Sequence, residues 1–206
     1  LVTVVIPTLN RAMYLEIALE SVLRQSYQNL EIIILDDGGT DATLNVVEAH
    51  RDKRIRYVRH PSQLGFVANW TYGVRIANGN FICILGDDDF YGPCFIESRV
   101  EVFKKYSNVV AATGAFQFCD GEGKMVGTSR SPVREIAEFS GEKLIQLTIG
   151  ITGEWFNGAT MYRADALRSV WDKAMLAGTA LDLAMHTLLA IEENARIVFI
   201  PEPQMC

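Results

Sequence analysis

The hydrophobic residues of this chain form short continuous runs, separated by stretches with a helical period. The apolar runs cover Val2–Ile6, Glu31–Leu35, Ile55–Arg59 and Phe81–Leu85. Runs of this kind are typical of strands buried on both faces, as in parallel sheets. Helices between such strands imply right-handed crossovers. The pattern therefore predicts an α/β fold with a mostly parallel central sheet flanked by helices, Rossmann-like in its N-terminal half.

The segments between these strands carry helical signals. Arg11–Ser26 places its apolar residues on one face. Asp41 can cap a second helix, whose apolar side is formed by Leu44 and Val47. A third helix is expected over Phe66–Asn78.

Beyond residue 89 the alternation is looser. Pro93 suits the first turn of a helix. Val109–Phe118 indicates a strand that leads into a hairpin through residues 121–123, and Gly127–Phe139 lacks a period and is predicted to be a loop. The remaining expected elements are helices around Gly141–Ile149 and Ala180–Asn194, and strands near Ala159–Tyr162 and over Arg196–Ile200.

Length and charge narrow the possible classes of protein. The 206 residues contain no internal repeat and no linker, so we expect one domain over residues 1–206. A formal net charge of −6 argues against non-specific binding to nucleic acid, which requires a basic face. No apolar run reaches the roughly 20 residues of a membrane span, and no signal peptide precedes the first strand. We expect a cytoplasmic protein with a truncated C-terminus; association with the inner face of the membrane and the oligomeric state stay open.

Four cysteines, Cys83, Cys94, Cys119 and Cys206, are scattered along the chain without the spacing of a zinc site. This distribution favours buried, reduced thiols in a reducing compartment over disulfide bonds.

Three adjacent acids, Asp87, Asp88 and Asp89, follow the fourth predicted strand. Carboxylates crowded at the end of a buried strand repel one another unless a cation neutralises them. Oxygen ligands favour Mg²⁺ or Mn²⁺, and Mg²⁺ often takes one or two carboxylates together with substrate phosphates. A solvated acidic turn, with Asp89 capping the next helix, is the alternative interpretation.

Two further polar clusters follow the first and second predicted strands. The pair Asp36-Asp37 is compatible with a simple turn or with a contact to a nucleotide. In the stretch Pro7–Arg11, Asn10 can cap a helix or face the same ligand. Because ligands of open α/β sheets bind at the carboxyl ends of the strands, we expect all three clusters to share one edge.

Several classes of enzyme lack their characteristic motifs in this sequence. GxGxxG after the first strand, GxxxxGK[ST] and GxSxG are all absent. A dinucleotide-dependent oxidoreductase, a P-loop enzyme and a nucleophilic hydrolase are therefore disfavoured. A response-regulator receiver would carry acids after its first strand, where this chain has Pro7-Thr8.

The ordered motifs resemble those of the family 2 glycosyltransferases, inverting enzymes with the GT-A fold, over essentially the whole chain. The matching segments are Val4–Arg11, Leu19–Tyr27, Glu31–Asp41, Gly65–Trp70 and Gly79–Asp89, with Pro93 beyond. The resemblance implies a nucleotide-sugar-binding half over residues 1–89 and an acceptor-binding half over residues 90–206.

The resemblance also implies roles for individual residues. Thr8 and Asp37 match positions that contact the nucleoside of a donor expected to be a UDP-sugar, and Asp87 matches a position near the sugar or ribose. Asp88 matches the acid that holds a divalent ion, Mn²⁺ or Mg²⁺, on the diphosphate, with Asp89 in support. The other implied donor-binding residues are Pro7, Asn10, Arg11, Gly65 and Asn69.

Two positions depart from the commonest pattern of the family. Gly86 stands at the first acidic position of the DxD motif, and Trp70 stands where many relatives carry an arginine. The first departure leaves the ribose contact open, and the second leaves the identity of the base open.

The resemblance places the catalytic base that deprotonates the acceptor hydroxyl at Asp182, near the start of a late helix. From the sequence alone, Asp182 is equally compatible with a capping role. Segments 127–139 and 150–155 are compatible with a cover over a glycan or lipid-linked acceptor, with Trp155 stacked on a sugar. Packing of Trp155 in the core is the alternative, and it is the commoner one for a tryptophan. A sugar nucleotidyltransferase and a non-catalytic nucleotide-sugar-binding module are the alternative functions.

Overall fold

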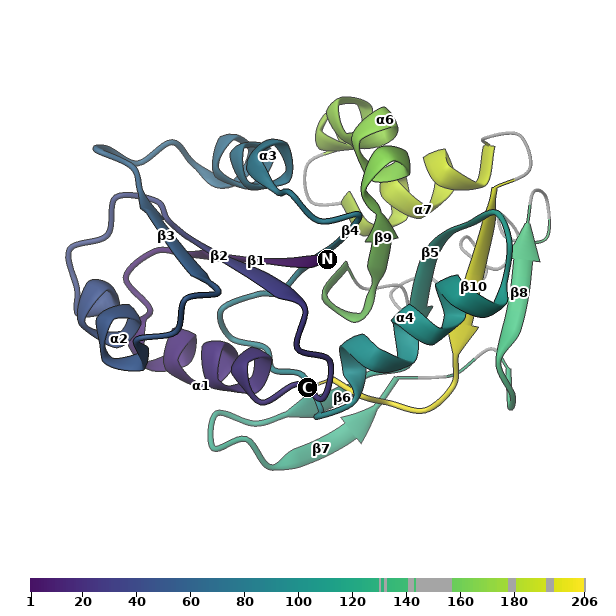
Figure 1. Ribbon diagram of the computed structural model, residues 1–206, viewed down its shortest axis with the longest axis horizontal. Helices are drawn as coiled ribbons and strands as arrows, with labels where there is room; N and C mark the ends of the chain where they lie inside the picture. The colour runs from purple at the N-terminus through teal and green to yellow at the C-terminus, as the bar shows by residue number, and fades with distance from the viewer. Residues whose placement is uncertain are drawn as a thin grey trace.

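The strands of the sequence assemble into one large mixed sheet and one small hairpin in the computed structural model (Figure 1). The structure describes residues 1–129, 131, 133–140, 143, 157–177, 181–191 and 195–205, without the side chains of residues 157 and 181–183. The strands are β1 (Val2–Thr8), β2 (Leu30–Asp36), β3 (Ile55–Arg59), β4 (Phe81–Ile84), β5 (Val109–Gly114), β6 (Gln117–Cys119), β7 (Met125–Thr128), β8 (Ala137–Ser140), β9 (Met161–Arg163) and β10 (Arg196–Ile200).

The large sheet has the strand order β3-β2-β1-β4-β9-β5-β10-β8. Strands β3, β2, β1 and β4 are mutually parallel, and β10 runs parallel to β5. Strand β9 pairs antiparallel with both β4 and β5, and β8 pairs antiparallel with β10. The prediction of a mostly parallel sheet with a Rossmann-like N-terminal half is therefore confirmed.

Helices cover both faces of the sheet, with α1, α2 and α4 on one face and α3, α6 and α7 on the other (Figure 1). This arrangement buries β1 and β2 on both faces, which explains their uninterrupted apolar sequence. No helix in the described part of the chain is long and apolar enough to cross a membrane. The helices are α1 (Ala12–Leu23), α2 (Thr43–His50), α3 (Phe66–Ile76), α4 (Phe95–Lys105), α6 (Ala164–Met175) and α7 (Leu181–Ile191), with a 3₁₀ turn η1 (Asn157–Ala159).

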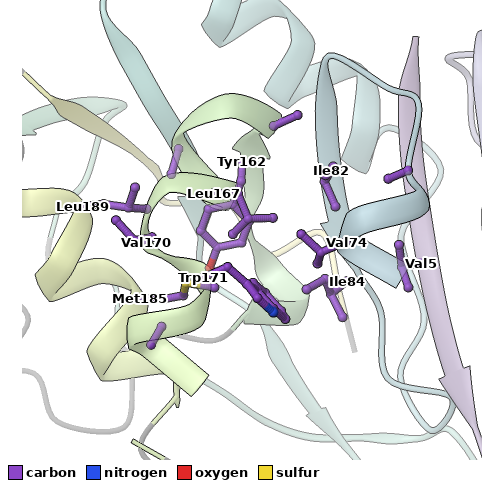
Figure 2. Close-up of a cluster of buried hydrophobic side chains, with 14 of the residues drawn as sticks. Val5, Val74, Ile82, Ile84, Tyr162, Leu167, Val170, Trp171, Met185 and Leu189 are labelled. Carbon is purple, nitrogen blue, oxygen red and sulfur yellow. The ribbon is translucent and has the colours of Figure 1, made fainter. Parts of the chain in front are cut away.

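The core on the α3, α6 and α7 face centres on two aromatic side chains. Tyr162 of β9 and Trp171 of α6 are both buried, and they join Met185 of α7 to the sheet (Figure 2). The indole N–H of Trp171 donates to Thr71 Oγ1 at 3.0 Å. Helix α6 is thereby fixed to α3.

Several expected elements differ from the structure. Helix α6 was missed, although Leu167, Val170, Trp171 and Ala174 repeat at helical spacing along it. The loop prediction over Gly127–Phe139 is wrong at its ends, because β7 reaches Thr128 and β8 pairs with β10. A short strand of this kind has no periodic signal of its own and is fixed by its partner.

Three details of the other predictions also change. Leu44 is exposed, so the buried side of α2 is formed by Thr43 and Val47. Helix α3 ends at Ile76, two residues earlier than expected. The helix expected around Gly141–Ile149 lies outside the described residues, apart from residue 143.

The hairpin β6–β7 packs beside the last residues of the chain. Its strands pair antiparallel around the turn at residues 120–123, as predicted. The backbone N–H of Gln117 donates to the Met205 carbonyl at 2.8 Å, and Met205 also forms a bridge with Tyr91. Cys119 is disulfide-bonded, whereas Cys83 and Cys94 are free thiols. The prediction of reduced cysteines is therefore wrong for Cys119, because the spacing of cysteines in the sequence does not show which of them meet in the fold.

Candidate functional site

The carboxyl ends of β1, β2 and β4 bring the three polar clusters of the sequence to one edge of the sheet. Thr8 lies opposite Asp36 in the β1–β2 register, and the N–H of Asp37 donates to the Thr8 carbonyl at 3.0 Å. The Thr8 hydroxyl donates to Asp87 Oδ2 at 2.7 Å. Thr8 therefore links the loop after β2 to the loop after β4.

Arg11 holds two of the three adjacent acids. Its guanidinium donates to Asp87 Oδ1 at 2.9 Å and to Asp88 Oδ2 at 2.8 Å. Burial opposes the charged form of Arg11, but the hydrogen bond to Asp88 and the charge of Asp87 outweigh it, so the pKa of Arg11 is raised. The Asp87 side chain is only 6% exposed, whereas that of Asp88 is 50% exposed. Asp88 is thus the acid that a ligand reaches from solvent.

The carboxyl groups of this loop are hard to ionise together. Burial raises the pKa of Asp87, although the Thr8 hydroxyl and the Arg11 charge act in the opposite direction. The pKa of Asp89 is raised to about 7, first by burial and then by the negative charges of Asp88 and Asp87. Arg11 does not fully offset this repulsion, so a bound cation would stabilise the ionised loop.

Gly86 provides the space in which two of these carboxylates converge. A Cβ atom at Gly86 would lie 2.8 Å from Asp89 Oδ2 and 3.1 Å from Asp88 Oδ1. No group of three or more acidic, histidine or cysteine side chains among the described residues is arranged to hold a metal. Mg²⁺ needs only one or two carboxylates when phosphates supply the remaining ligands. The oxygens over Gly86 fit an ion of that kind.

Asp37 organises the loop before α3. Its Oδ1 accepts the N–H of Leu64 at 2.7 Å, and its Oδ2 accepts the N–H of Gly65 at 2.9 Å. Gly65 has a φ of +87°, which glycine adopts without strain. Each carboxylate oxygen keeps a lone pair for a further donor. Asp37 and Gly65 are therefore brought together, as the sequence predicted for two residues of one binding site.

The other predicted donor-binding residues differ in their accessibility. Pro7 is buried in β1, opposite Leu35. Asn10 is exposed with a φ of +55°, and its Oδ1 accepts the N–H of Thr40 at 2.7 Å. Asn69 is buried, and its side-chain amide bonds His60 Nε2 and the Leu35 carbonyl. Asn69 therefore stabilises the segment between β3 and α3 from the interior of the protein. This buried position does not favour a direct contact between Asn69 and a ligand.

Asp36 has a role that the sequence did not assign. Its Oδ1 accepts the Gly39 N–H at 2.6 Å, and its Oδ2 accepts the Tyr57 hydroxyl at 2.5 Å. Burial and the hydrogen bond to Asp36 both raise the pKa of Tyr57. The first acid of the pair thus fixes the turn, so that the second, Asp37, faces the loop before α3. The doubled acid was visible in the sequence, but this division of roles was not.

The remaining predictions concern residues whose placement is not described. Asp182 is the second residue of α7, and its side chain lies outside the described part of the structure. Segment 150–155, with Trp155, also lies outside it. The site that can be described is therefore the half formed by residues 8–89.

The sequence matches one protein family over most of its length. Residues 3–171 match the model of Glycosyl transferase family 2. An uncharacterized glycosyltransferase of Haemophilus influenzae is 34% identical over 135 residues, which are 63% of this chain and 54% of the relative. The chain thus spans about half the length of that relative.

Solved structures share the fold at low sequence identity. S. aureus TarS 1–349 in complex with UDP has a TM-score of 0.80 and 18% identity, over 99% of this chain and 59% of that chain. The mannosyltransferase PcManGT from Pyrobaculum calidifontis, in complex with GDP-Man and Mn²⁺, has a TM-score of 0.64 and 18% identity, over 98% and 54%. The α/β architecture is that of the GT-A fold.

Proposed function

Because the chain belongs to glycosyl transferase family 2, we propose that it transfers a sugar from a nucleoside diphosphate to an acceptor hydroxyl with inversion at the anomeric carbon. The observation that carries this proposal is the convergence of Thr8, Arg11, Asp87 and Asp88 at the edge where ligands of open α/β sheets bind. The donor lies on residues 1–89 and the acceptor on residues 90–206.

The nucleoside of the donor lies against Thr8 and the loop held by Asp37. The carboxylate of Asp37 accepts a hydrogen bond from the base, which we take to be uracil. The complex of TarS with UDP supports this choice, and the complex of PcManGT with GDP-Man makes guanine the alternative to test. Arg11 lies beside Asp88 and offers its guanidinium to the diphosphate.

Asp88, with Asp89 in support, is the residue that holds Mn²⁺ or Mg²⁺. The ion would offset the negative charge that develops on the departing diphosphate. An ion held by Asp88 would leave Arg11 with Asp87 as its acceptor, and the Arg11 guanidinium would then be available to the phosphates. Asp87 keeps its bonds to Thr8 and Arg11 and preserves the shape of the loop.

Asp182 is the base that deprotonates the acceptor hydroxyl. A carboxylate at the start of α7 accepts the hydroxyl proton while that oxygen attacks the anomeric carbon. A positioned base of this kind contributes roughly 10²- to 10⁴-fold to the rate.

A binding screen tests the donor site. UDP-, dTDP- and GDP-sugars with Mn²⁺ are compared by thermal shift, and we expect a UDP-sugar to give the largest stabilisation. Asp88→Ala should remove the Mn²⁺-dependent part of donor affinity in calorimetry, while Glu48→Ala, an exposed acid on α2, should not. If no nucleotide sugar binds in the presence of Mn²⁺, the proposed function is wrong.

The products of turnover test the reaction. Free nucleoside diphosphate indicates transfer, whereas pyrophosphate indicates a sugar nucleotidyltransferase. Asp182→Asn should abolish transfer and leave donor affinity nearly unchanged. Unchanged turnover in this variant would remove Asp182 from the role of base.

A further inference from the structure

A cavity of about 580 Å³ adjoins the loop of residues 86–89, which we call the acid loop. Its walls come from α1, the acid loop and the hairpin β6–β7, and Met205 also lines it. Asp88 and Asp89 line this cavity, whereas Asp87 bonds Thr8 at the sheet edge. The loop thus presents Asp87 to the nucleotide edge and Asp89 to the cavity, and Asp88, which bonds Arg11, borders both.

The aromatic wall of the cavity is held in place before any ligand binds. Phe116 and Phe118 lie two residues apart and meet edge to face, with ring centroids 5.3 Å apart. Gly127 stands opposite Phe118 in the hairpin register, and a Cβ at Gly127 would lie 3.5 Å from the Phe118 ring. The N–H of Phe116 donates to Ser129 Oγ at 2.9 Å. The Phe118 ring is therefore packed against Phe116 and Gly127, and half of its surface is exposed.

The charges around this wall limit what can fill the cavity. Asp88, Asp89, Asp120 and Glu122 line it, and no Lys or Arg does among the lining residues that the structure describes. With an ion bound at Asp88, an anionic ligand such as a phosphate would still face the like charges of Asp120 and Glu122. A hydrocarbon chain would take Asp88 away from water without offering a hydrogen bond in return, which is costly for a carboxylate. The lining therefore suits an uncharged ligand with an apolar face and hydroxyl donors.

We propose that this cavity binds the acceptor as an uncharged sugar unit that stacks on Phe118 and directs its hydroxyls to the carboxylates and to Gln117. A pyranose ring has one C–H face for the aromatic side chain and a rim of hydroxyl groups for acceptors. Tyr14, which packs under the Arg11 guanidinium, closes the side nearest the donor. This assignment rests on the proposed function. It specifies the chemical class of the acceptor that receives the donor's sugar.

Ligand-observed NMR tests the assignment without requiring turnover. The probes are methyl glycosides of neutral hexoses and the matching methyl glycosides of uronic acids, added to the chain with UDP and Mn²⁺. We expect saturation transfer to the C–H face of at least one neutral glycoside and none to its uronic counterpart. Phe118→Ala should weaken that binding about tenfold, and Phe118→Trp should restore it.

A matched control and a second measurement separate this inference from the proposed function. Val126→Ala removes an exposed apolar side chain from the same hairpin outside the cavity, and it should leave glycoside binding unchanged. UDP affinity with Mn²⁺ should be equal in Phe118→Ala and the parent chain, which shows that the donor site is intact.

Three results overturn the assignment while leaving the donor site standing. They are equal binding of uronic and neutral glycosides, no binding of any glycoside in the panel, and a loss of UDP-sugar affinity with unchanged glycoside binding in Phe118→Ala. The last result would place the donor sugar in the cavity. Loss of nucleotide binding in the parent chain would instead count against the proposed function.

Discussion

Among single residues, Asp89 carries a carboxyl group that titrates near neutral pH. Its pKa lies at about 7 instead of 3.8 because of burial and the charges of Asp88 and Asp87. Between these two values the folded protein keeps a proton that the unfolded chain has released. The free energy of unfolding therefore falls as the pH rises through this window. The full destabilisation of the fold by the ionised Asp89 carboxylate is present above pH 7.

Asp89→Asn should remove this penalty. We expect a gain in stability of about 2 kcal/mol at pH 8, less than the full shift implies because the side chain retains contact with water, and no gain at pH 4. Urea unfolding in the presence of a chelator measures both values without metal. Asp172→Asn, which changes an exposed acid on α6, serves as the control and should give no pH-dependent gain. An equal gain at both pH values would show that Asp89 does not titrate in this range.

Metal binding should depend on the same ionisation. An ion over Gly86 requires Asp89 to be charged, so each unit of pH below 7 should weaken Mn²⁺ affinity by up to about tenfold. Calorimetry at pH 6 and pH 8, in buffers of different ionisation enthalpy, measures the affinity and the protons released. A pH-independent affinity would mean that Asp89 is not near the ion.

At the scale of elements, the packing of α3 on the sheet depends on one glycine. A Cβ at Gly73 would lie 2.4 Å from Leu35 Cδ1 and 2.7 Å from Val5 Cγ1, both in fully buried side chains. Helix α3 therefore approaches β1 and β2 more closely than a helix with alanine at this position could. This approach sets the position of Gly65 and of the loop that Asp37 holds.

Gly73→Ala should destabilise the protein by about 1–2 kcal/mol, because overpacking outweighs the roughly 1 kcal/mol gain in helix propensity. It should also lower donor affinity, since α3 moves away from the sheet. Gly121→Ala is the control, because a Cβ at that position meets nothing within 4 Å. Urea unfolding and calorimetry with UDP and Mn²⁺ measure the two effects. A stabilised Gly73→Ala variant would contradict this account of α3.

The sequence predicts those elements whose signal is local. Buried parallel strands are long and uniformly apolar, so β1, β2 and β4 were found within two residues of their ends, and the clusters that follow them were placed on one edge. Helix α6 also has a periodic signal, although the elements expected in this part of the sequence include only the short strand β9. Strand β8 could not be predicted from the sequence, because its residues form a strand only through pairing with β10.

The composition of the site was predictable, but its internal bonding was not. The acids, Thr8 and Arg11 were recognised as neighbours, because strand ends in a parallel sheet meet. The pairing of Arg11 with Asp87 and Asp88, and the use of Asp36 to fix a turn, depend on side-chain geometry that no pattern encodes. The cavity beside β6–β7 joins residues 14, 17, 88–90, 116–123 and 205, and only the tertiary structure brings these together.

At the scale of the whole molecule, Arg99 connects the end of the chain to the acid loop. This arginine is fully buried on α4 and has no carboxylate partner among the described residues. It donates to Gln204 Oε1 at 2.6 Å and to the Ala159 carbonyl at 3.2 Å, and it packs over the Phe95 ring. Burial lowers the pKa of Arg99 to about 10. The hydrogen bonds of this buried cation join α4 to Gln204 and to Ala159, which lie far apart in the sequence.

The segment that Arg99 holds reaches both walls of the cavity. The Gln204 carbonyl accepts the N–H of Gly92 at 2.7 Å, just beyond the acids, and the Met205 carbonyl accepts the N–H of Gln117 in the hairpin. Residues 204–205 thus fix the distance between the acid loop and β6. Loss of the Arg99–Gln204 bond should therefore destabilise the positions of both the acid loop and β6.

A double-mutant cycle tests this connection. Arg99→Met and Gln204→Ala should each destabilise the protein, and the pair should show a coupling of about 1–2 kcal/mol, because either change alone already breaks the bond. Lys105→Met with Gln204→Ala is the control, since Lys105 lies exposed on the same helix, and these changes should add. Both Arg99→Met and Gln204→Ala should also weaken Mn²⁺-dependent UDP affinity by a similar factor. Additive stabilities for Arg99→Met and Gln204→Ala, together with unchanged UDP affinity, would show that the acid loop holds its shape without the end of the chain.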